Sequence, residues 1–410
     1  MGLAHLPREA RLLVTMRAVR SIGQGALVVD FALYLHALGW SAPAIGALFM
    51  GALLVSAALA LIVGPLSDAR GRKAFLRAYE WAQIAAALVA LLSPNAGVLA
   101  VAAIIGGFGH GLNGGAGPFA PIELAWLSDL VATNDRASVY SLNTAMGFSG
   151  MAVGAFVASA PHFLRPLLPG PLAYRPLFIL VLLGALIALM LLRRIPEAAR
   201  APVAHELADS ANARITRAEN WTLLKLFGIN ALNGLGIGFM GPLMAYWFAI
   251  RFHHGPLSIG PIMGLALIVT AASSLLVGRL TRRYGAVRSV LGMRYLGLLC
   301  LLLLPLSPNF AVAAVLYVAR SALNRGTVGA RQALNLGLVR GHRHGLAASL
   351  NNVSTQVPRA LGPVLAGLLY HAGFLALPFF IAAGFQTAYL VLYRRLFAGS
   401  GSAPLSPPSG

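Results

Sequence analysis

Long apolar segments separated by short polar ones occupy most of the chain. Each run is long enough to cross a hydrocarbon layer of about 30 Å as a helix. Backbone groups in hydrocarbon must be hydrogen-bonded within the segment, so the runs predict helices, and the alternation typical of a membrane barrel is absent. The runs lie at residues 12–38, 43–66, 74–93, 96–126, 136–160, 174–192, 221–250, 256–280, 288–306, 308–336, 345–370 and 374–396. The pattern predicts an all-α membrane protein with twelve transmembrane helices.

The longest polar stretch divides these helices into two sets of six. It covers residues 193–220 and is too short to form a soluble domain. We therefore expect an N-terminal six-helix bundle at 1–192, a cytoplasmic linker at 193–220 and a C-terminal six-helix bundle at 221–397. The tail at 398–410 is rich in Gly, Ser and Pro and is predicted to be disordered.

The two sets of helices share an internal repeat. Residues 41–71 align without a gap with 255–285, an offset of 214 positions. The same offset places the Ser-Pro-Asn segment at 93–95 on the one at 307–309, and a Ser-Leu-Asn segment at 141–143 recurs at 349–351. Unrelated helices would not keep one register over this distance, so the pattern indicates a duplication that produced two pseudo-symmetric bundles.

The composition agrees with a surface that faces lipid. The chain has 410 residues, of which 58% are hydrophobic and 10% are charged, against about 25% charged residues in soluble proteins. Lys and Arg number 31 against 11 Asp and Glu, but most of these cations lie in short loops. Orientation in the membrane therefore explains the excess better than nucleic-acid binding, for which no water-facing basic domain is left.

The Lys and Arg residues fall in alternate loops, which predicts that both termini are cytoplasmic. Only two of the 31 cations are lysines, and this bias, with much Ala and Gly, is typical of a GC-rich bacterial genome. We expect an integral protein of the bacterial inner membrane, acting as a monomer. Residues 1–20 show no signal peptide. Cys300 is the single cysteine, so neither an intrachain disulfide nor a cysteine metal cluster is expected, and no cofactor is predicted.

The loop after the second predicted helix carries a specific motif. Residues 64–73 read GPLSDARGRK, which resembles the G-x-L-a-D-R-x-G-R-K signature of the major facilitator superfamily. Ala69 and Arg70 depart from it, and in the second half Arg282 replaces the acidic residue. The resemblance implies a conformational latch. Its candidate residues are Gly64, Asp68, Gly71, Arg72 and Lys73.

The resemblance also implies a secondary transporter that works by alternating access, with helices 1, 4, 7 and 10 around a central cavity. No nucleotide-binding loop is present, and no HExxH or GxSxG motif points to an enzyme. A sensor with the same fold but without solute flux, and an intramembrane enzyme, are more remote alternatives.

Charges at bilayer depth are expensive and usually line a cavity. The candidates for proton coupling are Asp30 in the first helix, His110 in the fourth and Glu123 near the cytoplasmic end of the fourth. Desolvation favours a neutral carboxyl and a nearby arginine favours the carboxylate, so Asp30 is open to either a proton-carrying role or a fixed salt bridge. His110 is equally compatible with packing, and Glu123 with interfacial anchoring.

The deep cations lie in the second half, at Arg320 and Arg325 in the tenth helix and Arg359 in the eleventh. Asn324 lies four residues from Arg320 on the same helix face, whereas Arg325 lies about 140° from Arg320. We expect these four residues to bind substrate.

An acid-bearing half that faces an arginine-bearing half favours proton-coupled movement of a small organic anion. A purely structural ion pair between the halves is the alternative for the charges. Drug or metabolite efflux by antiport is the alternative for the function. GPVLAG resembles the motif in helix 5 of the family's antiporters, but it lies here in the eleventh helix, which weakens that assignment.

Overall fold

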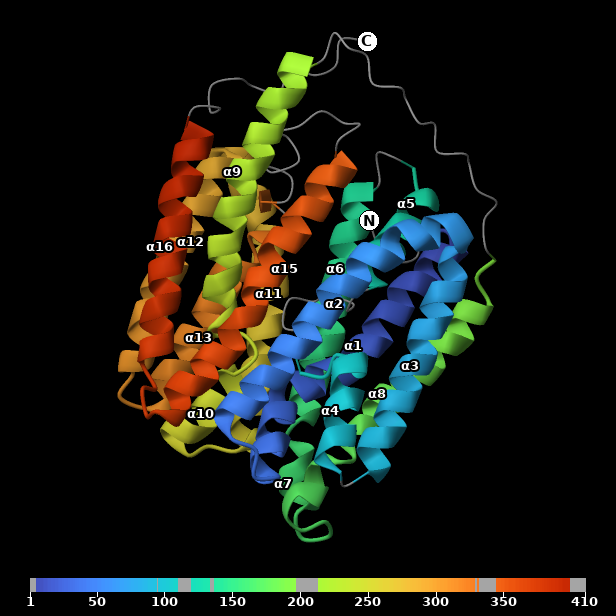
Figure 1. The fold of residues 1–410 in the computed structure, drawn as a ribbon, viewed down its shortest axis with the longest axis vertical. Coiled ribbons are helices and arrows are strands. Elements are labelled where there is room, and N and C mark those ends of the chain that lie inside the picture. Colours follow the sequence, from blue (N-terminus) through green and yellow to red (C-terminus); the bar gives the residue numbers. More distant parts are fainter. Residues whose placement is uncertain are drawn as a thin grey trace.

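The computed structural model describes residues 5–93, 95–109, 119–132, 136–196, 213–328, 330–331 and 344–398. The described part contains helices and turns and no strand. Two lobes, one from each half of the chain, lie side by side (Figure 1). The predicted all-α fold is confirmed.

The first lobe is built from α1 to α8 and the second from α9 to α16. The first contains α1 (Arg8–Ala37), α2 (Ala42–Arg70), α3 (Arg72–Leu92), α4 (Ala96–Gly106), α5 (Ala120–Asp129), α6 (Arg136–Val157), α7 (Ala160–Leu164), the 3-10 turn η4 (Gly170–Tyr174) and α8 (Leu177–Arg193). The second contains α9 (Ala213–Gly238), α10 (Met244–Phe252), α11 (Pro256–Tyr284), α12 (Ala286–Leu303), the 3-10 turn η6 (Leu304–Leu306), α13 (Phe310–Arg325), α15 (His344–His371) and α16 (Leu377–Ala398). Within the described ranges, seven segments are long and apolar enough to cross a membrane by themselves.

Three predicted spans are interrupted. The span at 96–126 ends its first helix at Gly106, and Gly107 and Gly109 have φ of 62° and 79° before α5 begins at Ala120. The span at 221–250 breaks between α9 and α10, where Gly241 and Pro242 lie. The span at 308–336 leaves its helix at Arg325. Glycine and proline disrupt helical backbone without lowering hydrophobicity, so the hydrophobic pattern alone does not locate these breaks.

The duplication is visible in matching local structures. Gly71, between α2 and α3, has φ 106°, and Gly285, 214 positions later between α11 and α12, has φ 83°. The side chain of Asn95 accepts a hydrogen bond from the Val98 amide at 3.1 Å, and that of Asn309 accepts one from the Val312 amide at 3.0 Å. Equivalent positions therefore perform the same turn and the same helix cap in each half.

Helices within each half cross at equivalent glycines. A methyl group on Gly25 of α1 would overlap the Met151 backbone of α6, and one on Gly238 of α9 would overlap the Arg359 backbone of α15. Such close backbone approach is the usual way in which helices associate in a bilayer.

The two halves meet through α2 against α15 and α6 against α11. Gly46 and Gly367 each lie against backbone of the opposite half, at Pro363 and Ala42 respectively. These contacts involve the first turns of α2 and the last part of α15, so they lie at the end of the molecule remote from where α1 begins and α16 ends (Figure 1). The lobes are therefore pressed together at that remote end.

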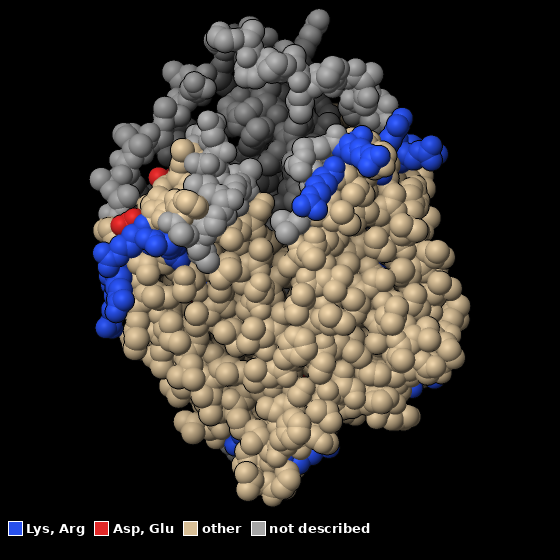
Figure 2. All heavy atoms as spheres, turned by 180° about the vertical axis from the view of Figure 1, so that it is seen from behind, with Lys and Arg blue, Asp and Glu red and all other residues tan. Residues whose placement is uncertain are grey.

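The outer surface carries its charge at the ends. Figure 2 shows Lys and Arg on the rims near the end at which α1 begins, above a broad band in which other residues cover the surface. Large apolar side chains such as Ile62, Leu92, Met190 and Val315 are exposed. A wide uncharged band with exposed apolar side chains is the surface of a protein embedded in lipid.

The remote interface can be tested with matched glycine substitutions. Gly46→Ala should lower the thermal stability of the purified protein, because the added methyl group has no room beside Pro363. Gly228→Ala is the control, since nothing lies within 4 Å of that position and alanine favours a helix by up to about 1 kcal/mol. Thermal unfolding in detergent measures both; equal Tm changes for the two variants would contradict this interface.

Candidate functional site

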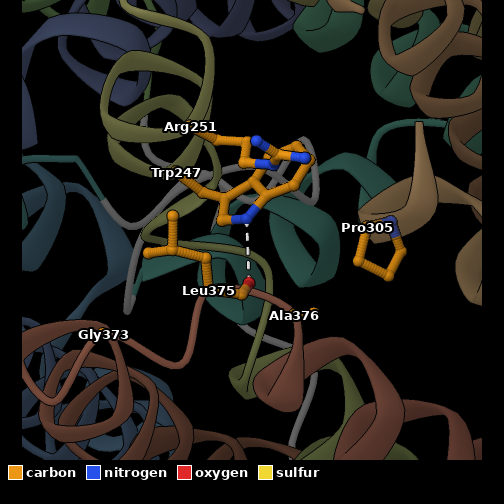
Figure 3. A pocket seen from close by; sticks show the side chains of 6 residues that line it. All are labelled: Trp247, Arg251, Pro305, Gly373, Leu375 and Ala376. Atoms are coloured by element: carbon orange, nitrogen blue, oxygen red, sulfur yellow. Dashed lines mark hydrogen bonds between the residues drawn. The ribbon is translucent and has the colours of Figure 1, made fainter. Parts of the chain in front are cut away.

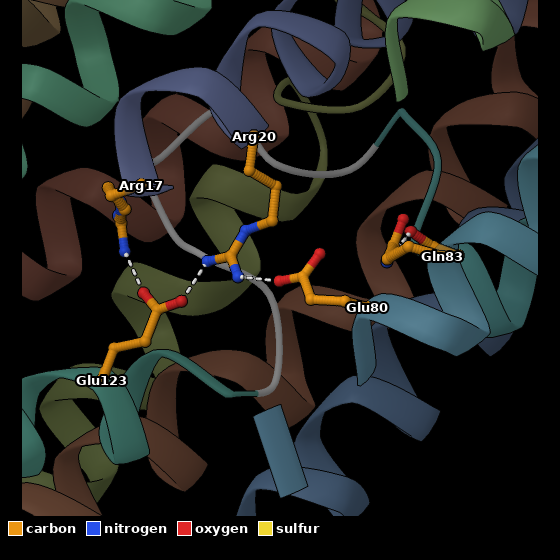
Figure 4. A network of polar contacts seen from close by, with 6 residues as sticks. Arg17, Arg20, Glu80, Gln83 and Glu123 are labelled. Atoms are coloured by element: carbon orange, nitrogen blue, oxygen red, sulfur yellow. Dashed lines mark hydrogen bonds and ion pairs between the residues drawn. The ribbon is translucent and has the colours of Figure 1, made fainter. Parts of the chain in front are cut away.

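A buried ion-pair network ties together three helices of the first half (Figure 4). Arg20 of α1 donates through Nη1 to Glu80 Oε1 of α3 at 2.8 Å, and through Nη2 to Glu123 Oε1 of α5. Arg17 Nη1 lies 3.5 Å from Glu123 Oε2. Every side chain in the network is at most 6% exposed. Two arginines and two glutamates make this cluster electrically neutral.

Aromatic and amide groups complete its surroundings. The Arg20 guanidinium lies 5.5 Å from the centre of the Tyr79 ring, which stacks on Phe119 at 4.5 Å. Gln83 Nε2 donates to the Gly106 carbonyl at 2.9 Å, at the residue where α4 ends. The network and its neighbours therefore hold α5 in place across the break in the fourth span.

The sequence pointed to Glu123 but not to its partners. The missed residues are Arg17, Arg20 and Glu80. Arg17 and Arg20 are three residues apart inside a predicted span, and that spacing puts both on one helix face. A buried face with two cations requires acids on neighbouring helices, which is the signal that would have found Glu80.

Asp30 is separate from this network. It lies further along α1, is 1% exposed, and its carboxyl oxygens accept no hydrogen bond from the described residues. Its neighbour Phe31 packs edge-on against Phe49, Phe108 and Phe178. Tyr174 of η4 lies within electrostatic range. Asp30 is thus a carboxyl group in apolar surroundings with no cation bound to it in the described part of the chain.

Three predicted site residues are described by the structure only in part or not at all. His110 lies outside the described residues. Gly64 and Asp68 belong to α2, and only their helical backbone is described.

The remaining latch residues contact the ends of other helices. Gly71 makes the turn, Arg72 Nη1 donates to Asp129 Oδ2 at 2.5 Å, and Lys73 Nζ donates to the Ile195 carbonyl at 2.5 Å. The loop between α2 and α3 therefore reaches the last residue of α5 and the chain just after α8.

The structure brings the three predicted arginines of the second half together. Arg320 is 9% exposed and Arg359 is 3% exposed, and Arg325 lies within electrostatic range of both. Arg359 Nη1 donates to Gln356 Oε1 at 3.2 Å. Arg325 is the last residue of α13, and its expected separation from Arg320 around the helix does not take it out of electrostatic range. Asn324 points elsewhere, because its amide packs against Gly297 of α12.

The second half has a single carboxylate side chain, Glu219 near the start of α9. All other Asp and Glu residues precede it in the chain. The buried arginines of α12, α13 and α15 therefore have no acidic residue in α10 to α16 with which to pair. A buried unpaired charge is strongly destabilising, so their compensation must come from neutral groups, from the other half or from a bound anion.

A separate cavity of about 300 Å³ lies at the remote end of the second half (Figure 3). Trp247 and Arg251 of α10, Pro305 of η6 and the turn before α16 line it. The Trp247 indole donates to the Leu375 carbonyl at 3.0 Å. This cavity does not include any of the predicted site residues.

The fold of two helical lobes with long apolar helices is that of a membrane transporter. The chain matches the model of the Major Facilitator Superfamily over residues 13–227 and 226–409, and it belongs to that family. It is 24% identical over 421 residues to the uncharacterized membrane protein YJR124C of Saccharomyces cerevisiae, covering 94% of this chain and 93% of the yeast protein.

Solved structures share the fold. The nucleoside transporter NupG is 12% identical with a TM-score of 0.73, and the match covers 95% of this chain and 100% of NupG. A bacterial homologue of the human lysosomal transporter Spinster, inward-facing and occupied, is 14% identical with a TM-score of 0.72, covering 96% and 98%. The human organic anion transporter TETRAN is 18% identical with a TM-score of 0.64, covering 94% and 100%.

The ion-pair network predicts a large stability loss when one cation is removed. Arg20→Met should cost about 3–5 kcal/mol, because it leaves two buried carboxylates without their shared partner. Arg72→Met, which breaks a pair whose Asp129 side chain is 54% exposed, should cost about 0–1 kcal/mol. Thermal unfolding in detergent compares the two, and adding Glu80→Gln to Arg20→Met should recover part of the loss. Similar losses in Arg20→Met and Arg72→Met would contradict a tightly coupled network.

Proposed function

We propose that this protein is a proton-coupled secondary transporter of a small organic anion, working by alternating access between its two halves. The observation that supports it most is the distribution of buried charge. Arginines lie buried in a half whose only carboxylate is Glu219 near the start of α9, and in the other half Asp30 is buried with no cation bound to it among the described residues.

The arginines support an anionic solute. Arginine stays charged at any relevant pH, so Arg320, Arg325 and Arg359 cannot remove their mutual repulsion by losing protons. A carboxylate or phosphate group matches the planar guanidinium fork. The cluster spans α13 and α15, so a bound anion would join two helices of the second half and lower the cost of burying them together.

Asp30 supports proton coupling. A charged carboxylate with no donor and no cation costs free energy in apolar surroundings, and a bound proton removes that cost. Glu123 is less suited, because a proton there would have to compete with two guanidinium groups. His110 stays a candidate from the sequence.

The orientation of the protein in the membrane is proposed from the positions of its Lys and Arg residues. We propose that both termini are cytoplasmic in a bacterial inner membrane, since the Lys and Arg residues gather at the end of the molecule where α1 begins. The remote interface then faces outward, and the loop between α2 and α3, with its latch, faces inward. In this proposal Asp68 and its neighbours serve as the latch while the protein changes between the two states of alternating access.

Reconstitution into proteoliposomes tests the coupling. Solute counterflow against a panel of organic anions, nucleosides, sugars and cationic drugs first identifies a transported compound. Asp30→Asn should then abolish accumulation driven by a proton gradient and keep solute exchange, because the variant mimics the protonated state permanently. Glu9→Gln removes a half-buried carboxylate from the first turn of α1; it is the control and should behave like the wild type. Gradient-driven accumulation by Asp30→Asn would exclude the coupling role of Asp30.

The solute's charge is tested at Arg359. Arg359→Gln should weaken binding of the transported anion at least about 10-fold, since charge-assisted hydrogen bonds contribute about 1.5–3 kcal/mol. Arg359→Lys should recover only part of it, because lysine lacks the bidentate fork. Half-saturation concentrations in counterflow measure both variants. A cationic solute, or unchanged affinity in Arg359→Gln, would overturn the anion assignment.

A further inference from the structure

The duplication places the ion-pair network of the first half onto a specific set of residues in the second. At the offset of 214 positions, Glu80 of α3 corresponds to Arg294 of α12. Gly25 and Gly238 make equivalent helix crossings 213 positions apart, and at that offset Arg17 and Arg20 of α1 correspond to Asn230 and Asn233 of α9. The Arg20–Glu80 pair of the first half thus corresponds to Asn233 and Arg294 in the second half.

The geometry of the two places agrees. Arg294 Nη1 donates to Asn233 Oδ1 at 3.0 Å, where the first half has Arg20 and Glu80 at 2.8 Å. The Arg294 guanidinium lies 4.8 Å from the centre of the Tyr389 ring, and Arg20 lies 5.5 Å from that of Tyr79. Both halves therefore join equivalent helices, α1 to α3 and α9 to α12, through a buried guanidinium that lies beside a tyrosine, Tyr79 on α3 in the first half and Tyr389 on α16 in the second.

Arg331 occupies the place of Glu123. Met151 and Arg359, the partners of the two crossing glycines, are 208 positions apart, and at that offset Glu123 corresponds to Arg331. Arg331 Nη1 contacts the Tyr389 hydroxyl at 3.4 Å and lies within electrostatic range of Arg294. Two arginines and two asparagines thus replace two arginines and two glutamates, and the site keeps two uncompensated positive charges.

We infer that Asn233, Arg294, Arg331 and Tyr389 bind a small oxyanion of the inorganic phosphate class, which replaces the two carboxylates that the first half supplies from its own chain. Arg294 is 3% exposed, and its Nε has no hydrogen-bond partner among the described residues, as is also true of Arg331 Nε. Guanidinium groups offer two parallel donors, which suit an oxyanion better than a spherical halide. Asn233, Arg294 and Tyr389 lie on α9, α12 and α16, and Arg331 follows α13. Arg320 of the proposed solute site is within electrostatic range of Arg294, so the test below separates the two sites.

Grafting the first half's chemistry tests the site. Asn233→Arg combined with Arg294→Glu recreates the Arg20–Glu80 pair. The Tm of each purified full-length protein is measured in inorganic phosphate and in chloride at equal ionic strength. Phosphate should raise the Tm of the wild type by at least about 3 °C, and the grafted variant should lose this response.

Two further variants locate the effect. Arg288→Gln removes one exposed positive charge from the same helix, α12, and Arg359→Gln alters the proposed solute site; both should keep the response to phosphate. Loss of the response in Arg359→Gln alone would place the anion at the solute site and overturn the inference. So would a full response in the grafted variant, or no response in the wild type.

If the grafted variant does not fold, the single variant Arg294→Gln tests the site instead. Isothermal titration with inorganic phosphate should then give at least a 10-fold weaker Kd than for the wild type. An unchanged Kd would contradict a role of Arg294 in binding.

Discussion

Burying a charge away from water is the constraint on which the rest of this structure depends. Two unit charges 4 Å apart interact by about 4 kcal/mol at an effective dielectric constant of 20, so a buried guanidinium is acceptable beside a carboxylate and costly beside another guanidinium. The first half meets the constraint within its own chain, since Arg20 is shared by Glu80 and Glu123. The second half contains no Asp or Glu after Glu219 in α9, and Arg294 lies beside amide and tyrosine groups. The two halves therefore share a fold but differ in whether carboxylates of the same half balance the buried arginines.

The duplicated features that remain equivalent are those required by the backbone. Gly71 and Gly285 each make a turn with positive φ, Asn95 and Asn309 each cap a helix, and Gly25 and Gly238 each allow a close crossing. Any larger side chain at the crossings would separate the helices, so these positions are fixed by geometry. Glu80 and Arg294, by contrast, are both buried and carry opposite charge. Charge can diverge between the halves because the helix crossings do not depend on it.

The sequence predicted the fold more completely than the site. Hydrophobic length located the membrane-spanning segments within a few residues, because the bilayer imposes that length, but it did not locate the helix breaks near Gly107 and Gly241. The Arg20–Glu80 pair joins residues 60 positions apart, and only the folded structure, in which long side chains bridge α1 and α3, reveals it. Helical geometry separated Arg320 from Arg325, yet the end of α13 at Arg325 and the length of the side chain bring them within electrostatic range. Side-chain reach and helix ends are not encoded in periodicity.

Because helix breaks leave α5 as a short separate segment, ion pairs at its two ends hold it in place. α5 is a short segment that is held at its first turn by Glu123, through Arg17 and Arg20, and at its last residue by Asp129, through Arg72. The first of these attachments is buried and the second is largely exposed, so the first resists opening while the second is weakened by water and salt. The buried attachment therefore ties α5 to α1, and the exposed one ties its end to the start of α3. In the second half the corresponding position carries Arg331, within electrostatic range of Arg294, and a bound anion would lower the cost of packing the two guanidinium groups together. Under the proposed function, an anionic solute at Arg320, Arg325 and Arg359 would contribute free energy to one packing of the second half and not to the other, which makes its occupancy part of the conformational equilibrium.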